Sequence, residues 1–193
     1  MEEEVEITAE VNVGLNDLLK IMKDNGFVLK EEYDLNDIYL IKNDDKSENY
    51  LHMLNKCVLI RSIIFPDHEY YLVTYKYKEY TRDKDIKNQT KISCKIENPK
   101  EMSLIFERLG FEELIKINDH LLVFYNNTDE IAIQYVNNKH LYIEIEKESE
   151  THTYSSLKQM KDFFKKYNIP IKNDNYFAKK AEVELQERYQ DEK

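Results

Sequence analysis

Glycine and proline are both scarce in this sequence, and their scarcity excludes several classes of function. The 193 residues include three glycines and three prolines, whereas the usual glycine share of about 7% would give roughly a dozen glycines. The sequence contains no GxGxxG, GxxxxGK[ST] or GxSxG pattern. It therefore lacks the glycine loops of P-loop and dinucleotide-binding proteins and the nucleophile elbow of α/β-hydrolases. No proline-rich linker divides the chain.

Positive charge is also in deficit. The sequence has 28 lysines and arginines against 38 aspartates and glutamates, a net charge of −10. A surface of that sign repels a phosphate backbone, so we expect no nucleic-acid polymer as a partner. A few basic residues in a cleft, together with a divalent metal ion, can still bind a small anion. A phosphorylated small molecule therefore remains a candidate partner.

Long apolar runs are absent, and cysteine is rare. No run approaches the length of a membrane span, and the N-terminal segment MEEEVEI has neither the basic nor the apolar part of a signal peptide. The two cysteines, Cys57 and Cys94, have no metal-binding spacing, and we expect reduced thiols. These features predict a cytoplasmic protein with no membrane partner. They leave the oligomeric state open.

The same order of elements occurs twice along the sequence: a strand, an amphipathic helix ended by Gly-Phe, and three further strands. In both helices apolar residues recur at i, i+3, i+4 and i+7, and a glycine at the C′ position ends each one. The two apolar stripes are Leu15, Leu18, Leu19 and Met22 before Gly26, and Met102, Ile105, Phe106 and Leu109 before Gly110. The predicted strands are 4–11, 27–42, 56–64, 70–78, 91–97, 114–125, 130–136 and 141–147. This repeat indicates duplication of a large unit.

Local signals define the remaining elements. Asn98 is typical of a helix N-cap, with Pro99 at the first helical position and Glu101 three residues after the cap. The polar stretch 43–55 is predicted to be a loop. Two further helices are predicted in the tail, one marked by Leu157, Met160, Phe164 and Tyr167 and one over Tyr176 to Arg188 after a cap near Asp174.

Eight alternating strands with few helices favour an antiparallel sheet with two unlike faces. Closing such a sheet into a barrel removes its exposed edges. If the helices cover the apolar rows from outside, the charged rows line a polar tunnel. The predicted fold is therefore α+β: an eight-stranded antiparallel β-barrel, or tunnel, built from two strand-helix-three-strand repeats. Residues 1–193 are assigned to a single domain, with halves at about 1–80 and 89–148 and C-terminal helices at about 153–188.

The sharpest polar pattern consists of Glu4 with Glu6 and Glu144 with Glu146. Within each pair the residues are two apart on a strand, so both carboxylates point to one face, roughly 6 to 7 Å apart along the chain. If the first and last strands face one another across a barrel, four carboxylates converge. Oxygen ligands at that density suit Mg²⁺ or Mn²⁺ rather than Zn²⁺. The alternative is that both strand faces are simply exposed to solvent.

Basic residues recur with the same period of two. Arg61 is the single charge in the run CVLIRSII, Lys76 and Lys78 share a strand face, and Lys91 and Lys95 share another. Arginine binds phosphate oxygens in a bidentate manner, and lysine binds them as a point charge. These five residues are the predicted phosphate-binding set. A solvated strand face is again the alternative interpretation.

Together these residues and motifs resemble the CYTH superfamily, the triphosphate tunnel metalloenzymes that include class IV adenylate cyclases and thiamine triphosphatases. The segments that carry the resemblance are Glu4-Val5-Glu6-Ile7-Thr8, Asp37-Ile38-Tyr39, Val58-Leu59-Ile60-Arg61, Thr74-Tyr75-Lys76, Leu109-Gly110-Phe111 and Glu144-Ile145-Glu146. The resemblance covers about residues 1–185. It implies an eight-stranded antiparallel tunnel that binds a triphosphate compound with a divalent metal ion, and a triphosphatase or adenylate cyclase-like activity.

The sequence departs from the family pattern at several positions that handle phosphate or metal. These positions are Thr8, Leu59, Ser93, Asp119, Leu121 and Gln134. Fewer positive groups stabilise less of the charge that develops during phosphoryl transfer, and we assign no catalytic residue. Three functions stay open: metal-dependent hydrolysis or cyclisation of a triphosphate compound, inactive binding of a nucleotide or other phosphorylated ligand, and a barrel that holds an apolar ligand or a protein partner.

Overall fold

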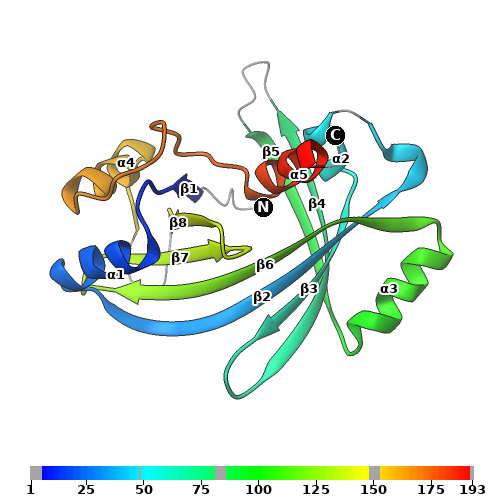
Figure 1. Ribbon diagram of the computed structural model, residues 1–193, viewed down its shortest axis with the longest axis horizontal. Helices are drawn as coiled ribbons and strands as arrows, with labels where there is room; N and C mark the ends of the chain where they lie inside the picture. The colour runs from blue at the N-terminus through cyan, green and yellow to red at the C-terminus, as the bar shows by residue number, and fades with distance from the viewer. Residues whose placement is uncertain (1–5, 48, 81–85, 148–152, 192–193) are drawn as a thin grey trace. The chain divides into compact units, whose positions relative to one another are not determined.

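The computed structural model describes residues 6–47, 49–80, 86–147 and 153–191, and within these ranges it forms one eight-stranded antiparallel sheet with five α-helices (Figure 1). The strands are β1 (Glu6–Glu10), β2 (Val28–Lys42), β3 (Val58–Ile64), β4 (Glu69–Tyr80), β5 (Ile86–Ile96), β6 (Phe111–Tyr125), β7 (Glu130–Val136) and β8 (His140–Glu146). Their order in the sheet is β1-β8-β7-β6-β2-β3-β4-β5. The predicted α+β class and the number of strands are confirmed. No backbone ladder of the described residues joins β1 to β5, so the predicted barrel is only approximate.

The helices are α1 (Leu15–Asp24), α2 (Tyr50–Leu54), α3 (Pro99–Arg108), α4 (Leu157–Lys166) and α5 (Lys180–Asp191), with a short 3₁₀ turn, η1, at Asn43–Asp45. Gly26 and Gly110 have φ values of 77° and 84° and end α1 and α3 as predicted. Asn98 caps α3, because its side chain accepts hydrogen bonds from the backbone of Lys100 (3.0 Å) and Glu101 (3.2 Å). Across the described residues, the helices are too short and too polar to cross a membrane.

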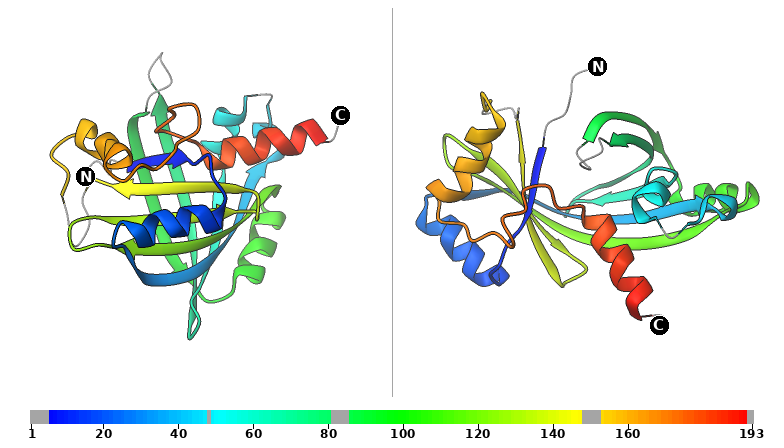
Figure 2. Two further views of the ribbon diagram at one scale, coloured as in Figure 1. Left: turned by 60° about the vertical axis from the view of Figure 1, so that its left-hand side comes forward. Right: turned by 90° about the horizontal axis from the view of Figure 1, so that it is seen from above.

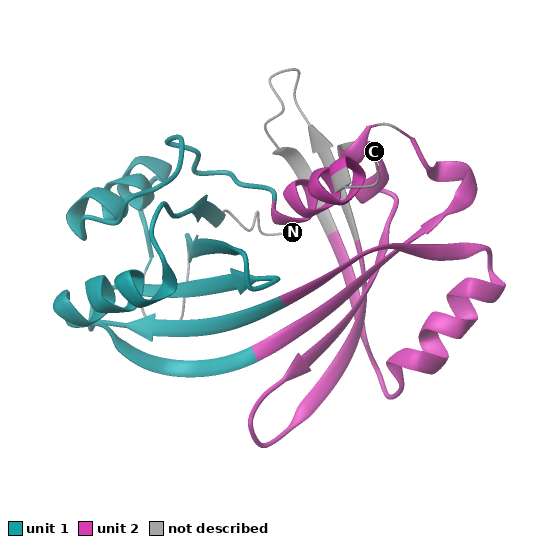
Figure 3. Ribbon diagram, viewed as in Figure 1, with its two compact units in different colours: residues 1–33, 119–179 teal, residues 34–118, 180–193 magenta. Residues whose placement is uncertain are grey.

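The chain divides into two compact units (Figure 3). Unit 1 comprises residues 1–33 and 119–179, and unit 2 comprises residues 34–118 and 180–193. The long strands β2 and β6 each run through both units, so each unit draws on both sequence repeats. The assignment of the whole chain to a single domain stays a prediction.

The core of unit 1 lies between one face of the sheet and the helices α1 and α4, which share one side of β7 and β8 (Figure 2). The backbone register sets Ile7 opposite Ile145, and Ala9 opposite Ile143. All four are buried together with Leu18 and Met22 of α1 and with Met160, Phe163 and Phe164 of α4. Each fully buried side chain of this size contributes roughly 1.5–3 kcal/mol. The prediction that amphipathic helices cover the apolar rows is confirmed in this unit.

Asp129 lies in the turn between β6 and β7 and is hydrogen-bonded to residues in and beside α4. Its carboxylate accepts hydrogen bonds from the hydroxyls of Tyr167 (2.6 Å), Tyr154 (2.8 Å) and Thr128 (2.9 Å) and from Lys166 Nζ (2.9 Å). Burial acts to raise the pKa of Asp129, but these four hydrogen bonds outweigh it and lower the pKa to about 2. The sequence carried no signal for this cluster.

Two segments fold differently from the sequence prediction. The predicted loop 43–55 contains α2, where Met53 is fully buried and Tyr50 stacks on Tyr189 of α5 with ring centroids 5.7 Å apart. The last helix begins at Lys180 rather than Tyr176, because the residues before it extend along β1. There the Ala178 N–H donates to the Thr8 carbonyl (2.8 Å). In both segments, contacts with residues distant in the sequence accompany the difference from the predicted secondary structure.

Candidate functional site

The carboxylates predicted as metal ligands lie on β1 and β8, which are hydrogen-bonded neighbours. Glu6 is opposite Glu146 in the register, and Thr8 is opposite Glu144. Residues directly opposite in an antiparallel pair project from the same face, so Glu6, Glu144 and Glu146 share the face turned away from the core of unit 1. We call these three residues the acidic face. Glu4 lies outside the described residues.

The strands that carry these glutamates do not face one another across a barrel. Instead, β1 and β8 are adjacent in the sheet. Adjacency still brings the carboxylates together, because cross-strand partners lie only about 4.5–5.5 Å apart at their Cα and Cβ atoms. Convergence of the described glutamates therefore follows from strand pairing.

The acidic face borders the uncharged residue Thr8, and beyond it along β1 lies Glu10, which contacts His140 and Lys172. Thr8, which stands where the family pattern has lysine, is 7% exposed, and its hydroxyl donates to Glu144 Oε2 (3.4 Å). Glu10 continues the same row of β1, and its Oε1 contacts His140 Nδ1 (3.1 Å) and Lys172 Nζ (2.9 Å). His140 could have been found from the sequence, since it precedes Glu144 by four residues and shares its strand face. Lys172 gave no such signal.

The donor chemistry of the acidic face suits a hard divalent cation. Its described ligands are three carboxylates, of which Glu6 and Glu146 are exposed and Glu144 is half-buried. Carboxylate oxygens are the ligands that Mg²⁺ and Mn²⁺ prefer, whereas Zn²⁺ favours imidazole and thiolate groups. The residues present therefore fit the metal ion that the family resemblance implies.

The residues predicted to bind phosphate lie in unit 2. Arg61 of β3 pairs with Leu72 of β4, and Leu72 pairs with Lys95 of β5, so Arg61 and Lys95 share one face. Lys91 precedes Lys95 by four residues on β5 and therefore lies on the same face. Its partner in the register is Lys76 of β4. Lys78 occupies the register position opposite Gln89, and the side chains of Lys76 and Lys78 lie outside the described part of the chain. We call Arg61, Lys91 and Lys95 the basic face.

Arg61 is held by an internal ion pair. Its Nε and Nη2 donate to the two carboxylate oxygens of Asp37, at 2.7 and 2.6 Å, in the bidentate geometry that arginine favours. The Asp37 side chain is 8% exposed and the Arg61 side chain 27%. A phosphate at Arg61 has to compete with this carboxylate. Asp37 was recognised in the sequence as part of an Asp-x-Tyr motif, but its partner lies 24 residues away and was missed.

The two lysines of the basic face are more accessible than Arg61. Both Lys91 and Lys95 are exposed, and Lys95 Nζ lies 5.7 Å from the centre of the Tyr70 ring. The row of side chains across the sheet between Lys91 and Lys95 carries no charge. It consists of the cross-strand partners Leu59, Thr74 and Ser93, and the hydroxyls of Thr74 and Ser93 are hydrogen-bonded to each other. Leu59 is one of the departures from the family pattern and is 5% exposed. The basic face thus offers two exposed lysines and one neutralised arginine.

The two cysteines differ in their exposure to solvent. Both thiols are free, Cys57 buried and Cys94 exposed. Burial raises the pKa of Cys57 to about 12, so this thiol stays protonated at neutral pH. The expectation of unpaired thiols is confirmed.

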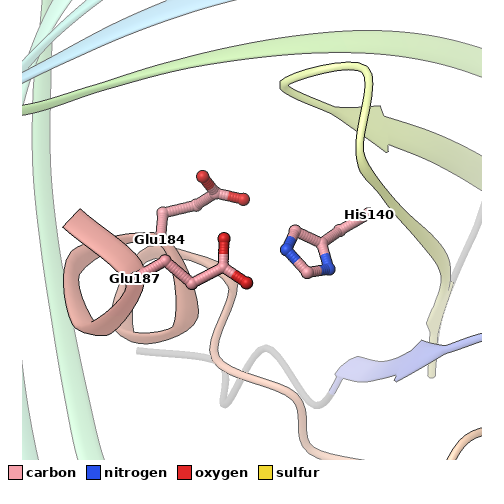
Figure 4. A group of neighbouring side chains, drawn as sticks. All are labelled: His140, Glu184 and Glu187. Carbon is pink, nitrogen blue, oxygen red and sulfur yellow. The ribbon is translucent and has the colours of Figure 1, made fainter. Parts of the chain in front are cut away.

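A further acidic pair lies on α5. Figure 4 shows Glu184 and Glu187 projecting from neighbouring turns of this helix in unit 2. His140, drawn in the same figure, begins β8 of unit 1, and its Nδ1 lies within hydrogen-bond distance of Glu10 there. Two carboxylates on one helix provide too few ligands to define a metal centre, and we assign them no site.

Comparison with known proteins identifies the fold. No protein-family model matches the sequence, and no curated protein sequence matches it. Among solved structures, the PH1819 protein of Pyrococcus horikoshii is 18% identical with a TM-score of 0.67, and the match covers 96% of this chain and 99% of that one. HpAC1 from Hippeastrum, a candidate adenylyl cyclase described as having a dominant triphosphatase activity, is 12% identical with a TM-score of 0.64, and the match covers 95% of this chain and 96% of that one.

A third structure extends the likeness to bacteria. A candidate adenylate cyclase from Vibrio parahaemolyticus is 13% identical with a TM-score of 0.56, and the match covers 90% of this chain and 94% of that one. At such low identity the likeness concerns the fold. The matches extend over nearly the whole of both chains, so the likeness in fold is not confined to one part of this chain.

Proposed function

We propose that this chain, which has the CYTH-like fold, binds a triphosphate compound together with Mg²⁺ or Mn²⁺. The observation that carries the proposal is the strand register, which gathers Glu6, Glu144 and Glu146 on one face in unit 1 and Arg61, Lys91 and Lys95 on one face in unit 2. Carboxylates and basic groups are the two kinds of ligand that a metal–triphosphate complex needs. The triphosphatase activity stated for HpAC1 supports the same ligand class.

The residues suggest binding more strongly than turnover. The acidic face of unit 1 would hold the cation. The basic face would contact phosphate oxygens through its lysines. Thr8 and Leu59 supply no charge where the family pattern has basic groups, and Arg61 already neutralises Asp37. With fewer donors to stabilise a transition state, tight binding is easier to retain than fast hydrolysis or cyclisation.

The metal half of the proposal predicts a thermal response. Mn²⁺ at about 100 times its Kd is expected to raise the Tm by about 5–10 °C, because a ligand bound only by the folded state stabilises it. Glu146→Gln should reduce this shift, since it removes one carboxylate of the acidic face. The matched control is Glu31→Gln, which removes an exposed carboxylate of β2. Equal shifts in all three proteins would mean that the acidic face binds no cation.

The anion half predicts a loss of affinity. In calorimetric titration with tripolyphosphate and Mn²⁺, Lys95→Ala is expected to weaken binding about 10-fold, because a charge-assisted hydrogen bond contributes about 1.5 kcal/mol or more. Lys20→Ala, on the exposed side of α1, should leave binding unchanged. Binding that neither variant alters would move the phosphate site away from the basic face. No binding by the wild type would favour the apolar ligand or protein partner.

A substrate panel distinguishes binding from catalysis. Nucleoside triphosphates, thiamine triphosphate and tripolyphosphate are each incubated with Mn²⁺, and phosphate, pyrophosphate and cyclic nucleotide are measured together. Thermal stabilisation without any product is the expected result. Release of phosphate or formation of a cyclic nucleotide would instead make the chain an enzyme on the compound concerned.

A further inference from the structure

Helix α3 exposes part of the apolar stripe that the sequence indicated. Ile105 and Leu109 of the stripe are 53% and 61% exposed, and Leu104 beside them is 57% exposed. In the first repeat, the corresponding stripe of α1 places Leu18 and Met22 in the core with no exposed surface. The equivalent helices of the two repeats therefore differ in burial: α1 buries its apolar side chains, whereas α3 leaves apolar side chains exposed to water, which is energetically unfavourable.

The exposed surface continues from α3 onto the sheet. A groove of about 540 Å³ runs beside the helix; its apolar lining is Ile96, Met102 and Ile105, and its polar lining is Glu97, Asn98 and Glu101. Ile92 lies on the same face of β5 as Ile96 and is 64% exposed. We call Ile92, Ile96, Leu104, Ile105 and Leu109 the α3 patch. It is turned away from the basic face, since Ile92 and Ile96 alternate with Lys91 and Lys95 along β5.

The charges beside the patch are arranged so that α3 complements a second copy of itself. Glu101, Leu104, Ile105 and Arg108 occupy positions i, i+3, i+4 and i+7 and so share one side of the helix. All four are exposed. In an antiparallel pair with a twofold axis between residues 104 and 105, Leu104 of each copy meets Ile105 of the other, and Glu101 of each meets Arg108 of the other.

Neighbouring registers lack this agreement. A twofold axis through residue 104 would place Glu101 against Glu107, and an axis through residue 105 would place Glu101 against Leu109, so neither register pairs Glu101 with a basic residue. Like charges held close together across a contact are unfavourable. Of these three registers, only the axis between residues 104 and 105 pairs opposite charges, which is the form of charge complementarity expected of an isologous interface.

We propose that the α3 patch is a homodimer interface in which two copies of α3 pack antiparallel about this axis. Apolar contacts between Leu104 and Ile105 supply the attraction, and the Glu101–Arg108 pairs fix the register. One helix with a flanking groove makes a small interface, so the expected dimer is of micromolar affinity. The proposal concerns a different face from the one that carries the phosphate ligands and is independent of the proposed function.

The test is sedimentation velocity of the full chain without ligand, at concentrations from about 1 to about 200 µM. The wild type is expected to pass from monomer to dimer in this range. Arg108→Glu should weaken dimerisation at least about 10-fold, because both ion pairs become repulsive. The double variant Glu101→Arg, Arg108→Glu should restore it, since the pairs then reform with reversed sign. A merely misfolded variant would not be rescued in this way.

Two further variants test the apolar contact. Leu104→Asp should weaken the dimer about 100-fold, because each copy loses an apolar contact at the centre of the interface. Val28→Asp is the control, since Val28 is an equally exposed apolar residue (68%) in unit 1, and it should dimerise like the wild type. A wild type that stays monomeric throughout overturns the proposal. So does a dimer that Arg108→Glu leaves unchanged, because it must use another surface.

Discussion

Replacement of Arg61 by alanine is expected to lower the free energy of unfolding by about 3 kcal/mol, because a buried carboxylate is left without its half-buried partner. The reason is Asp37, whose side chain is 8% exposed and whose two carboxylate oxygens would lose the bidentate guanidinium. Urea unfolding followed by circular dichroism at neutral pH measures the change. Lys20→Ala, which removes an exposed cation from α1, should cost less than about 0.5 kcal/mol.

A double variant without charge at positions 37 and 61 distinguishes two causes of the destabilisation: the unpaired buried carboxylate of Asp37 and the lost packing of the Arg61 side chain. Asp37→Leu combined with Arg61→Met removes both charges and keeps apolar volume, and it should recover most of the stability that Arg61→Ala loses. A double variant as unstable as Arg61→Ala would show that Arg61 acts through its packing. A fully stable Arg61→Ala would mean that water already screens the pair.

The second large effect is expected at Asp129. Asp129→Ala should lower the free energy of unfolding by about 3 kcal/mol, because the buried hydroxyls of Tyr154 and Tyr167 lose their common acceptor and each unsatisfied group costs about 1–3 kcal/mol. Urea unfolding is again the measurement. Asp162→Ala is the matched control, since this carboxylate of α4 is 52% exposed and should contribute little. Equal costs in the two variants would contradict a special role for Asp129.

The same cluster predicts how stability depends on pH. The pKa of Asp129 falls from the ordinary value of 3.8 to about 2 in the folded chain, so the unfolded state binds more protons between these values. The contribution of Asp129 is therefore complete above about pH 4 and is lost as the pH falls towards 2. Wild type should lose stability more steeply across this window than Asp129→Asn, which has no proton to bind. Parallel curves for the two proteins would contradict the lowered pKa.

The faces of the strands could be predicted from the sequence, because side-chain direction on a strand is local. Alternation over Glu6 to Glu10 assigned Ile7 and Ala9 to the core and Glu6 to the opposite face, and the structure agrees. A period of two requires only the pleated backbone of the strand itself. Helix ends were equally predictable, since Asn98 and Gly110 act on backbone groups within a few residues.

Contacts between distant segments could not be predicted in the same way. Nothing near Arg61 in the sequence indicates that Asp37 will neutralise it, and nothing near Thr8 indicates that Ala178 will hydrogen-bond to its backbone. The adjacency of β1 and β8 is of the same kind. Such pairings depend on which elements meet once the chain has folded, and many arrangements are compatible with one alternation pattern.

The two amphipathic helices divide most clearly what the sequence determined from what the tertiary structure decided. Their apolar stripes and glycine stops are alike, and the sequence by itself determined that both are helices. The tertiary structure decided that Leu18 of α1 is buried in a core shared with α4, while Ile105 of α3 stays 53% exposed. An apolar stripe in the sequence indicates that a helix has an apolar side. Burial of that side requires another apolar surface to pack against it, and such a surface comes from segments distant in the sequence.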